Sequence, residues 1–154
     1  MLSAEARDKL IEMLKAYPSA RSAVLPALHV AQEDQGYLGP EVIREVAEHF
    51  NLTPGDVESV VSFYTMYTRQ PLGKYVLQVC TNISCGLMGA DHIVNQLSEK
   101  LGIKPGETTP DGKFTLLTVE CLGTCGAAPV MQVNETFHEN LTAERMDEVL
   151  ESLE

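Results

Sequence analysis

The chain has 154 residues, 44% of them hydrophobic, and a formal net charge of −11 from 11 Lys and Arg against 22 Asp and Glu. This length and apolar content allow a buried core that needs no disulfides. The acidic balance argues against a free nucleic-acid-binding protein, which needs a basic face. No apolar run approaches the ~18–20 residues that span a bilayer, and the first residues show neither a signal core nor an Arg-rich transit character. We therefore expect a soluble intracellular protein without membrane insertion, whose thiols stay reduced.

Residues 1–72 show helical periodicity and are expected to form an N-terminal helical domain. A first helix is expected after a Ser3 N-cap. A second is expected over about residues 22–35, with Gly36 as its C-terminal stop. Pro26 is compatible with this second helix only in its first turn, because further along its ring removes a backbone hydrogen bond.

Two more helices are expected before the chain changes character. Pro40 fits the first position of the third helix. Thr53 is expected to cap the fourth helix, with Pro54 at its first position and Asp56 placed to complete a capping box. The expected buried face of this fourth helix consists of Val57, Val60, Val61 and Tyr64.

An apolar, aromatic stretch closes the helical half. Its members are Phe63, Tyr64, Met66 and Tyr67. We expect these side chains to pack where the helical half meets the second half. The alternative is an exposed patch that binds a partner protein.

Residues 73–154 alternate between strand-like and helix-like patterns. The expected elements are a strand over 74–79, a helix over 86–100, a strand over 114–120, a hairpin over 130–138 and a helix capped by Thr142. The first two strands and the helix between them form a βαβ unit, which should be parallel and right-handed. The fold class is therefore α+β: an N-terminal helical bundle followed by a thioredoxin-like α/β domain with a four-stranded mixed sheet.

The four cysteines of the chain form two close pairs in this second half. Cys80 and Cys85 are spaced C-x4-C, Cys121 and Cys125 are spaced C-x3-C, and 35 residues separate the pairs. Structural zinc sites usually use C-x2-C, and dithiol redox catalysts need C-x-x-C. A [2Fe–2S] cluster is wider than one zinc ion and accepts longer intervals, so it is the favoured interpretation. A tetrathiolate zinc site remains an alternative, as do redox-active disulfides or inert thiols.

Both pairs begin where a predicted parallel strand ends. Parallel strands end at the same edge of a sheet, so we expect the two cysteine segments to be neighbouring loops. Glycines and hydroxyl residues surround the cysteines: Gly86, Gly123, Gly126, Thr81, Ser84 and Thr124. Such glycines let the backbone approach a bulky cluster, and the hydroxyls offer hydrogen-bond donors. Ordinary turns would explain the glycines equally well.

Longer segments carry a family resemblance. Residues 79–86 and 120–131 resemble the cluster loops of thioredoxin-like [2Fe–2S] ferredoxins. Residues 27–38, 61–67 and 71–74 resemble the helical extension of the E-type subunit of NADH-quinone oxidoreductase, respiratory complex I. Related subunits of NAD(P)-linked hydrogenases and formate dehydrogenases share this extension and remain alternatives. A zinc-stabilised interaction module is the alternative from a different class.

The resemblance implies an electron-transfer subunit with one [2Fe–2S] cluster on Cys80, Cys85, Cys121 and Cys125. It implies a place on the flavoprotein subunit, which binds FMN and NADH, next to other peripheral-arm subunits on the cytoplasmic side of the inner membrane. The chain contains no G-x-G-x-x-G or Walker A pattern. It is therefore expected to act in an oxidoreductase only as a subunit, with no substrate site and no catalytic residue of its own.

The remaining candidates are structural. His29, His49, His92 and His138 are isolated from one another and lie outside the cysteine segments, so each is expected to be structural or on the surface. Pro129 stands where thioredoxin-like folds often place a cis-proline, so a cis Ala128–Pro129 bond is predicted.

Overall fold

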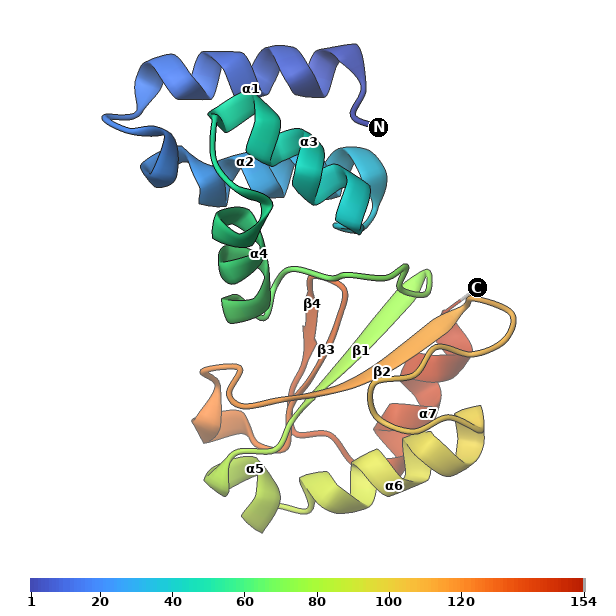
Figure 1. Cartoon of the computed structure of the whole chain (residues 1–154). Helices are drawn as coiled ribbons and strands as arrows, with labels where there is room; N and C mark the ends of the chain where they lie inside the picture. Colours follow the sequence, from blue (N-terminus) through green and yellow to red (C-terminus); the bar gives the residue numbers. More distant parts are fainter. Residues whose placement is uncertain (154) are drawn as a thin grey trace. The chain divides into compact units, whose positions relative to one another are not determined.

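The computed structural model describes residues 1–153 and divides into two compact units, Met1–Pro71 and Leu72 onward, called unit 1 and unit 2 below. Unit 1 is helical, and unit 2 combines a sheet with helices (Figure 1). No described helix combines the length and the apolar character needed to cross a membrane. The α+β class and the four-stranded mixed sheet predicted from the sequence are confirmed.

Unit 1 contains the four predicted helices: α1 (Ala4–Ala16), α2 (Ala20–Gln35), α3 (Pro40–Phe50) and α4 (Pro54–Phe63). The side chain of Ser3 caps α1 by accepting the N–H of Ala6. Thr53 and Asp56 form the predicted capping box of α4, in which each side chain accepts the backbone N–H of the other residue. These helix starts are therefore encoded by residues within one turn of them.

Pro26 lies in the second turn of α2, so the prediction that it must lie in the first turn is wrong. The helix begins at Ala20 because Ser19 is the N-cap and accepts the N–H of Ser22. Pro26 has no N–H to donate to the Ser22 carbonyl. The helix nevertheless continues, because apolar residues on both sides of the proline are fully buried and tertiary packing outweighs one lost hydrogen bond.

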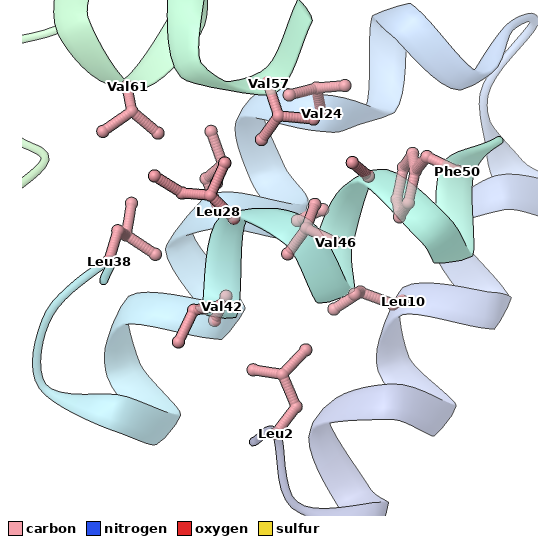
Figure 2. Close-up of a cluster of buried hydrophobic side chains, with 14 of the residues drawn as sticks. Leu2, Leu10, Val24, Leu28, Leu38, Val42, Val46, Phe50, Val57 and Val61 are labelled. Atoms are coloured by element: carbon pink, nitrogen blue, oxygen red, sulfur yellow. The ribbon is translucent and has the colours of Figure 1, made fainter. Parts of the chain in front are cut away.

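The core of unit 1 draws side chains from all four helices. Figure 2 shows Leu10 of α1, Leu28 of α2, Val46 of α3 and Val57 of α4 in one cluster, and none of them has exposed surface. The first residues of the chain are held against α3 by Glu45. Its carboxylate accepts the N–H of Leu2 at 2.8 Å and the Nε–H of Arg7 at 2.7 Å.

The end of α4 differs from the prediction. Val57 and Val61 are buried, but Tyr64 is 37% exposed, because the helix ends at Phe63 and Tyr64 has an extended backbone. Tyr67 is buried instead, and its hydroxyl donates a hydrogen bond to the Leu25 carbonyl at 2.7 Å. Phe63 and Met66 are exposed. The stretch therefore contributes one aromatic ring to the core of unit 1 and leaves its other three side chains exposed.

Unit 2 is built on one sheet. In chain order its elements are β1 (Tyr75–Cys80), α5 (Ile83–Leu87), α6 (Ala90–Leu101), β2 (Phe114–Val119), the 3-10 turn η1 (Cys125–Ala127), β3 (Met131–Val133), β4 (Thr136–His138) and α7 (Ala143–Ser152). The strand order is β2-β1-β3-β4, with β1 parallel to β2 and the other pairs antiparallel. Helix α6 packs on β1 and β2 and also contacts α7 (Figure 1).

The single helix predicted over residues 86–100 is in fact two helices. α5 ends at Leu87 and α6 begins at Ala90, with Gly89 between them at φ +96°. This left-handed conformation interrupts the helix and is accessible to glycine at little cost. Helix α5 therefore starts within the first cysteine segment, rather than after it.

Candidate metal centre

The two cysteine segments leave the sheet at the same end. β1 and β2 pair in parallel, with Cys80 opposite Val119, so Cys121 follows only two residues after the partner of Cys80. Cys85 lies in α5 and Cys125 begins η1. Figure 1 shows α5 and the segment around residue 125 on that side of unit 2. Residues far apart in the sequence are thus carried to one place by the parallel pairing.

The four cysteines are free thiols that differ in exposure. The Cys80 thiol donates to the carbonyl of Glu120, the residue before Cys121, at 3.9 Å. Cys80 and Cys85 are buried, whereas Cys121 and Cys125 are exposed. The group therefore has a side inside the protein and a side on the surface.

Backbone N–H groups point at the sulfur atoms. Burial raises the pKa of Cys80, but the N–H groups of Asn82 and Leu122 and the two neighbouring thiols outweigh it, so the pKa lies below its usual value. Gly123 donates its N–H to the Sγ of Cys121 at 3.3 Å. These donors come from both cysteine segments and favour negative charge on sulfur.

Cys85 has the opposite balance. Burial and the neighbouring Cys80 sulfur raise its pKa, and the N–H of Val130 opposes them only in part. Val130 also accepts the N–H of Cys80 at 3.1 Å. It follows the Ala128–Pro129 bond, which is cis as predicted. A third segment, just before β3, therefore completes the surroundings of the buried cysteines.

This donor set fits an iron–sulfur cluster by its chemistry. Thiolate sulfur is the usual ligand of such clusters, and N–H groups directed at sulfur are among the features that set their potentials. Within residues 1–153, no three His, Cys, Asp or Glu side chains are grouped so that they could hold a metal ion.

The four histidines were expected to be structural or on the surface, and their surroundings are as follows. The His29 ring lies beside that of Tyr67, with ring centroids 5.2 Å apart, and Nδ1 of His49 is 2.9 Å from the Glu45 carbonyl. Burial and the charge of Arg145 lower the pKa of His138. His92 lies on the exposed side of α6.

The glycines and hydroxyls predicted around the cysteines differ in their roles. Of the three glycines, only Gly123 has a positive φ, at +79°, so its conformation specifically favours glycine. The Thr81 hydroxyl donates to the Val119 carbonyl at 3.4 Å. The Thr124 hydroxyl is buried and has no hydrogen-bond partner in the described structure.

Sequence reasoning missed two features of the centre. Backbone donors such as Asn82 and Val130 give no sequence signal, because almost every residue carries an N–H. Ile83, Leu87 and Met88, in or next to the first cysteine segment, are 77%, 83% and 62% exposed. Three large apolar residues in and directly after the first cysteine segment were the available signal, but the prediction of one long helix from residue 86 obscured it.

Comparison with known proteins shows which family and which relatives this chain is similar to. The family described as thioredoxin-like [2Fe–2S] ferredoxin matches residues 10–154. The E-type subunit, number 2, of the NADH-quinone oxidoreductase of Rhizobium meliloti (strain 1021) is 46% identical over 146 residues, which are 95% of this chain and 87% of that protein. The E-type subunit of the Mycobacterium bovis oxidoreductase is 46% identical over 142 residues, but they are 92% of this chain and only 56% of that protein.

A solved structure is also similar. It is the crystal structure of an NAD⁺-reducing [NiFe]-hydrogenase in the H₂-reduced state, with a TM-score of 0.74 and 26% sequence identity. The match covers 84% of this chain and 22% of the hydrogenase chain. The fold described above therefore also occurs as a small part of a much longer polypeptide.

Proposed function

Because the chain belongs to the thioredoxin-like [2Fe–2S] ferredoxin family, with relatives that are E-type subunits of NADH-quinone oxidoreductase, we propose that it is the [2Fe–2S] electron-transfer subunit of such an oxidoreductase. Cys80, Cys85, Cys121 and Cys125 would hold one cluster. The observation that carries this proposal is the meeting of two cysteine segments at one end of the sheet, where the Cys80 thiol donates to the Glu120 carbonyl at 3.9 Å and Gly123 donates its N–H to Cys121 Sγ.

A bound [2Fe–2S] cluster would supply a site that takes up and releases one electron at a time. The chain's own groups prepare the site for that negative charge. The N–H groups of Asn82, Leu122 and Gly123 direct positive partial charge at sulfur. Burial of Cys80 and Cys85 keeps water from one side of the site, so these interactions act in a low dielectric.

The exposed side of the centre is where we place the partner. Cys121 and Cys125 are exposed there. Ile83, Leu87 and Met88 present apolar surface next to Cys85, and such surface favours contact with another protein. We propose that the partner is the flavoprotein subunit, which would carry the FMN and the NADH site and exchange single electrons with this chain.

The division of the chain follows the same proposal. Residues 73–154 would form the cluster domain, and residues 1–72 a helical domain that belongs to the docked subunit. In the assembled complex the chain would also contact other peripheral-arm subunits, on the cytoplasmic side of the inner membrane. Oxidation of NADH would occur on the partner, because this chain has no recognisable nucleotide motif.

A second candidate is the equivalent subunit of an NAD-linked hydrogenase. It is favoured by the TM-score of 0.74 against the NAD⁺-reducing hydrogenase, which is similar to 84% of this chain. Both candidates use the same cluster and differ in the complex that receives the electrons. Purification of the native complex and assay with a quinone or with H₂ would separate them.

The cluster itself is tested on the full chain purified without oxygen. We expect about two iron atoms and two acid-labile sulfides per chain, and a [2Fe–2S] EPR signal after reduction. Replacing any one of Cys80, Cys85, Cys121 or Cys125 with Ala should abolish the stable signal. Ser84→Ala, in the same loop as Cys80 and Cys85, is the matched control and should retain it.

Two results would reject the proposal. One zinc per chain without sulfide would indicate the zinc-stabilised module. A cysteine variant with the parent EPR spectrum would exclude that residue as a ligand.

A further inference from the structure

One hydroxyl group in the second cysteine segment lacks a partner. Thr124 lies between Cys121 and Cys125, and its Oγ1 is buried without any hydrogen-bond partner in the described structure. Thr124 is the N-cap residue of η1, but its side chain makes no capping hydrogen bond. Its carbonyl accepts the N–H of Ala127 at 3.0 Å, so the carbonyl has a partner and the side-chain hydroxyl has none. Buried hydroxyls are normally hydrogen-bonded, so an acceptor is expected beside Oγ1.

The first cysteine segment offers a direct comparison. Thr81 follows Cys80 in the sequence, and its hydroxyl already has an acceptor in the Val119 carbonyl at 3.4 Å. The other buried side-chain atoms without a hydrogen bond among residues 1–153 belong to Thr68, Gln96 and Asp147, which lie outside both cysteine segments. Within the described part of the cysteine segments, Thr124 alone combines burial with an unused donor.

The cysteines of the second segment indicate which group could be the missing acceptor. In the same segment, Gly123 donates its N–H to the Sγ of Cys121 at 3.3 Å, so a sulfur already accepts a hydrogen bond there. Thr124 is the immediate neighbour of Cys125, the fourth proposed ligand. Sulfur of a cluster carries negative charge and accepts hydrogen bonds, so it would satisfy a donor that no protein atom satisfies.

We propose that the Thr124 hydroxyl donates a hydrogen bond to a sulfur atom of the cluster and thereby raises its reduction potential. This inference rests on the proposed [2Fe–2S] site. Reduction makes the cluster one unit more negative, so a donor at sulfur stabilises the reduced state more than the oxidised state. Thr124 thus tunes the potential without being a metal ligand.

The test is an EPR-monitored redox titration of the full chain with its cluster. Thr124→Val keeps the side-chain shape and removes the hydroxyl. We expect the equilibrium constant for reduction to fall about tenfold, which for a one-electron couple is a potential lower by about 59 mV. Thr124→Ser keeps the hydroxyl and should stay near the parent potential.

Thr81→Val is the matched control, because its hydroxyl is bonded to a backbone carbonyl and not available to the cluster. It should leave the potential close to that of the parent. An unchanged potential in Thr124→Val, or equal shifts in Thr124→Val and Thr81→Val, would overturn the proposal.

Two further measurements keep the outcome clear. Iron and sulfide contents of the parent test the cluster itself, so an empty parent rejects the proposed function and the Thr124 proposal together, whereas a loaded parent leaves the titration to decide. A crystal structure of the loaded parent needs no variant. Thr124 Oγ1 within hydrogen-bond distance of a sulfur supports the proposal, and Oγ1 remote from every sulfur overturns it.

Discussion

Gly73→Ala is expected to destabilise unit 2, because the added methyl group has no room. Gly73 is buried at the approach to β1, and its N–H donates to Thr115 Oγ1 at 2.6 Å. A Cβ at this position would lie 2.8 Å from the carbonyl carbon of Phe114 and 3.0 Å from that of Lys113. Both neighbours are backbone atoms of the β2 start, so no side-chain rotation relieves the contact.

The cost follows from the movement that is required. To reach an ordinary contact of 3.4 Å, the two backbones must separate by about 0.6 Å, which loosens the hydrogen bond from Tyr75 N–H to the Lys113 carbonyl, now 2.8 Å. Overpacking of this kind costs typically ~1–3 kcal/mol. The lower entropy of an unfolded alanine returns ~0.4–1 kcal/mol. We therefore expect a net loss of about 1–2 kcal/mol.

Thermal unfolding measures this loss. For a chain of this size each kcal/mol shifts the midpoint by about 2–4 °C, and the visible absorption of the cluster follows unit 2 separately from the circular dichroism of the whole chain. The control is Gly55→Ala at the start of α4, where a Cβ meets only Thr53 Oγ1 at 3.8 Å. This control should be as stable as the parent or slightly more stable. A parent-like midpoint for Gly73→Ala would refute the steric reasoning.

Two other predictions concern charge and docking. Burial raises the pKa of Glu45, but the Leu2 N–H and the Arg7 guanidinium outweigh it and lower the pKa overall. The resulting contribution to the free energy of unfolding is complete above the unfolded pKa of about 4.3 and is lost as the pH falls through the lower folded pKa. Urea unfolding measured between about pH 6 and pH 3 should therefore show a steeper fall in the free energy of unfolding for the parent than for Glu45→Gln. Parallel curves for the two proteins would contradict this. Leu87→Glu should weaken binding of the proposed partner, the flavoprotein subunit, about tenfold or more while the EPR signal remains, because a charge replaces an exposed apolar side chain. Ile11→Glu on α1, where the side chain is also exposed, is the control. If Leu87→Glu binds the partner as tightly as Ile11→Glu does, α5 is excluded from the interface.

The helix starts of unit 1 could be predicted from the sequence, because they depend on capping hydrogen bonds between residues close together in the chain. Ser3, Thr53 and Asp56 act on N–H groups within three residues, so their effect needs no tertiary structure. The positions that deviated depend on distant contacts. Apolar periodicity continued through Gly89 although the backbone turns there, and Pro26 is kept inside α2 by its packing.

The centre shows the same division. The number, identity and spacing of the cysteines, and their places after two parallel strands, could be predicted because side-chain type and strand pattern are written in the sequence. The exposed apolar residues of α5 could not, because their exposure depends on where α5 ends.

The sequence by itself determined which side chains can bind a cluster, and that the two segments should meet at one sheet edge. Only the tertiary structure decided that Cys80 and Cys85 are buried and that Cys121 and Cys125 face outward. It also decided which backbone groups face sulfur: the N–H of Val130 reaches Cys85 from a segment just before β3. The physical reason is that a thiol is specified by one residue, whereas burial and the direction of an N–H are set by the path of the whole backbone.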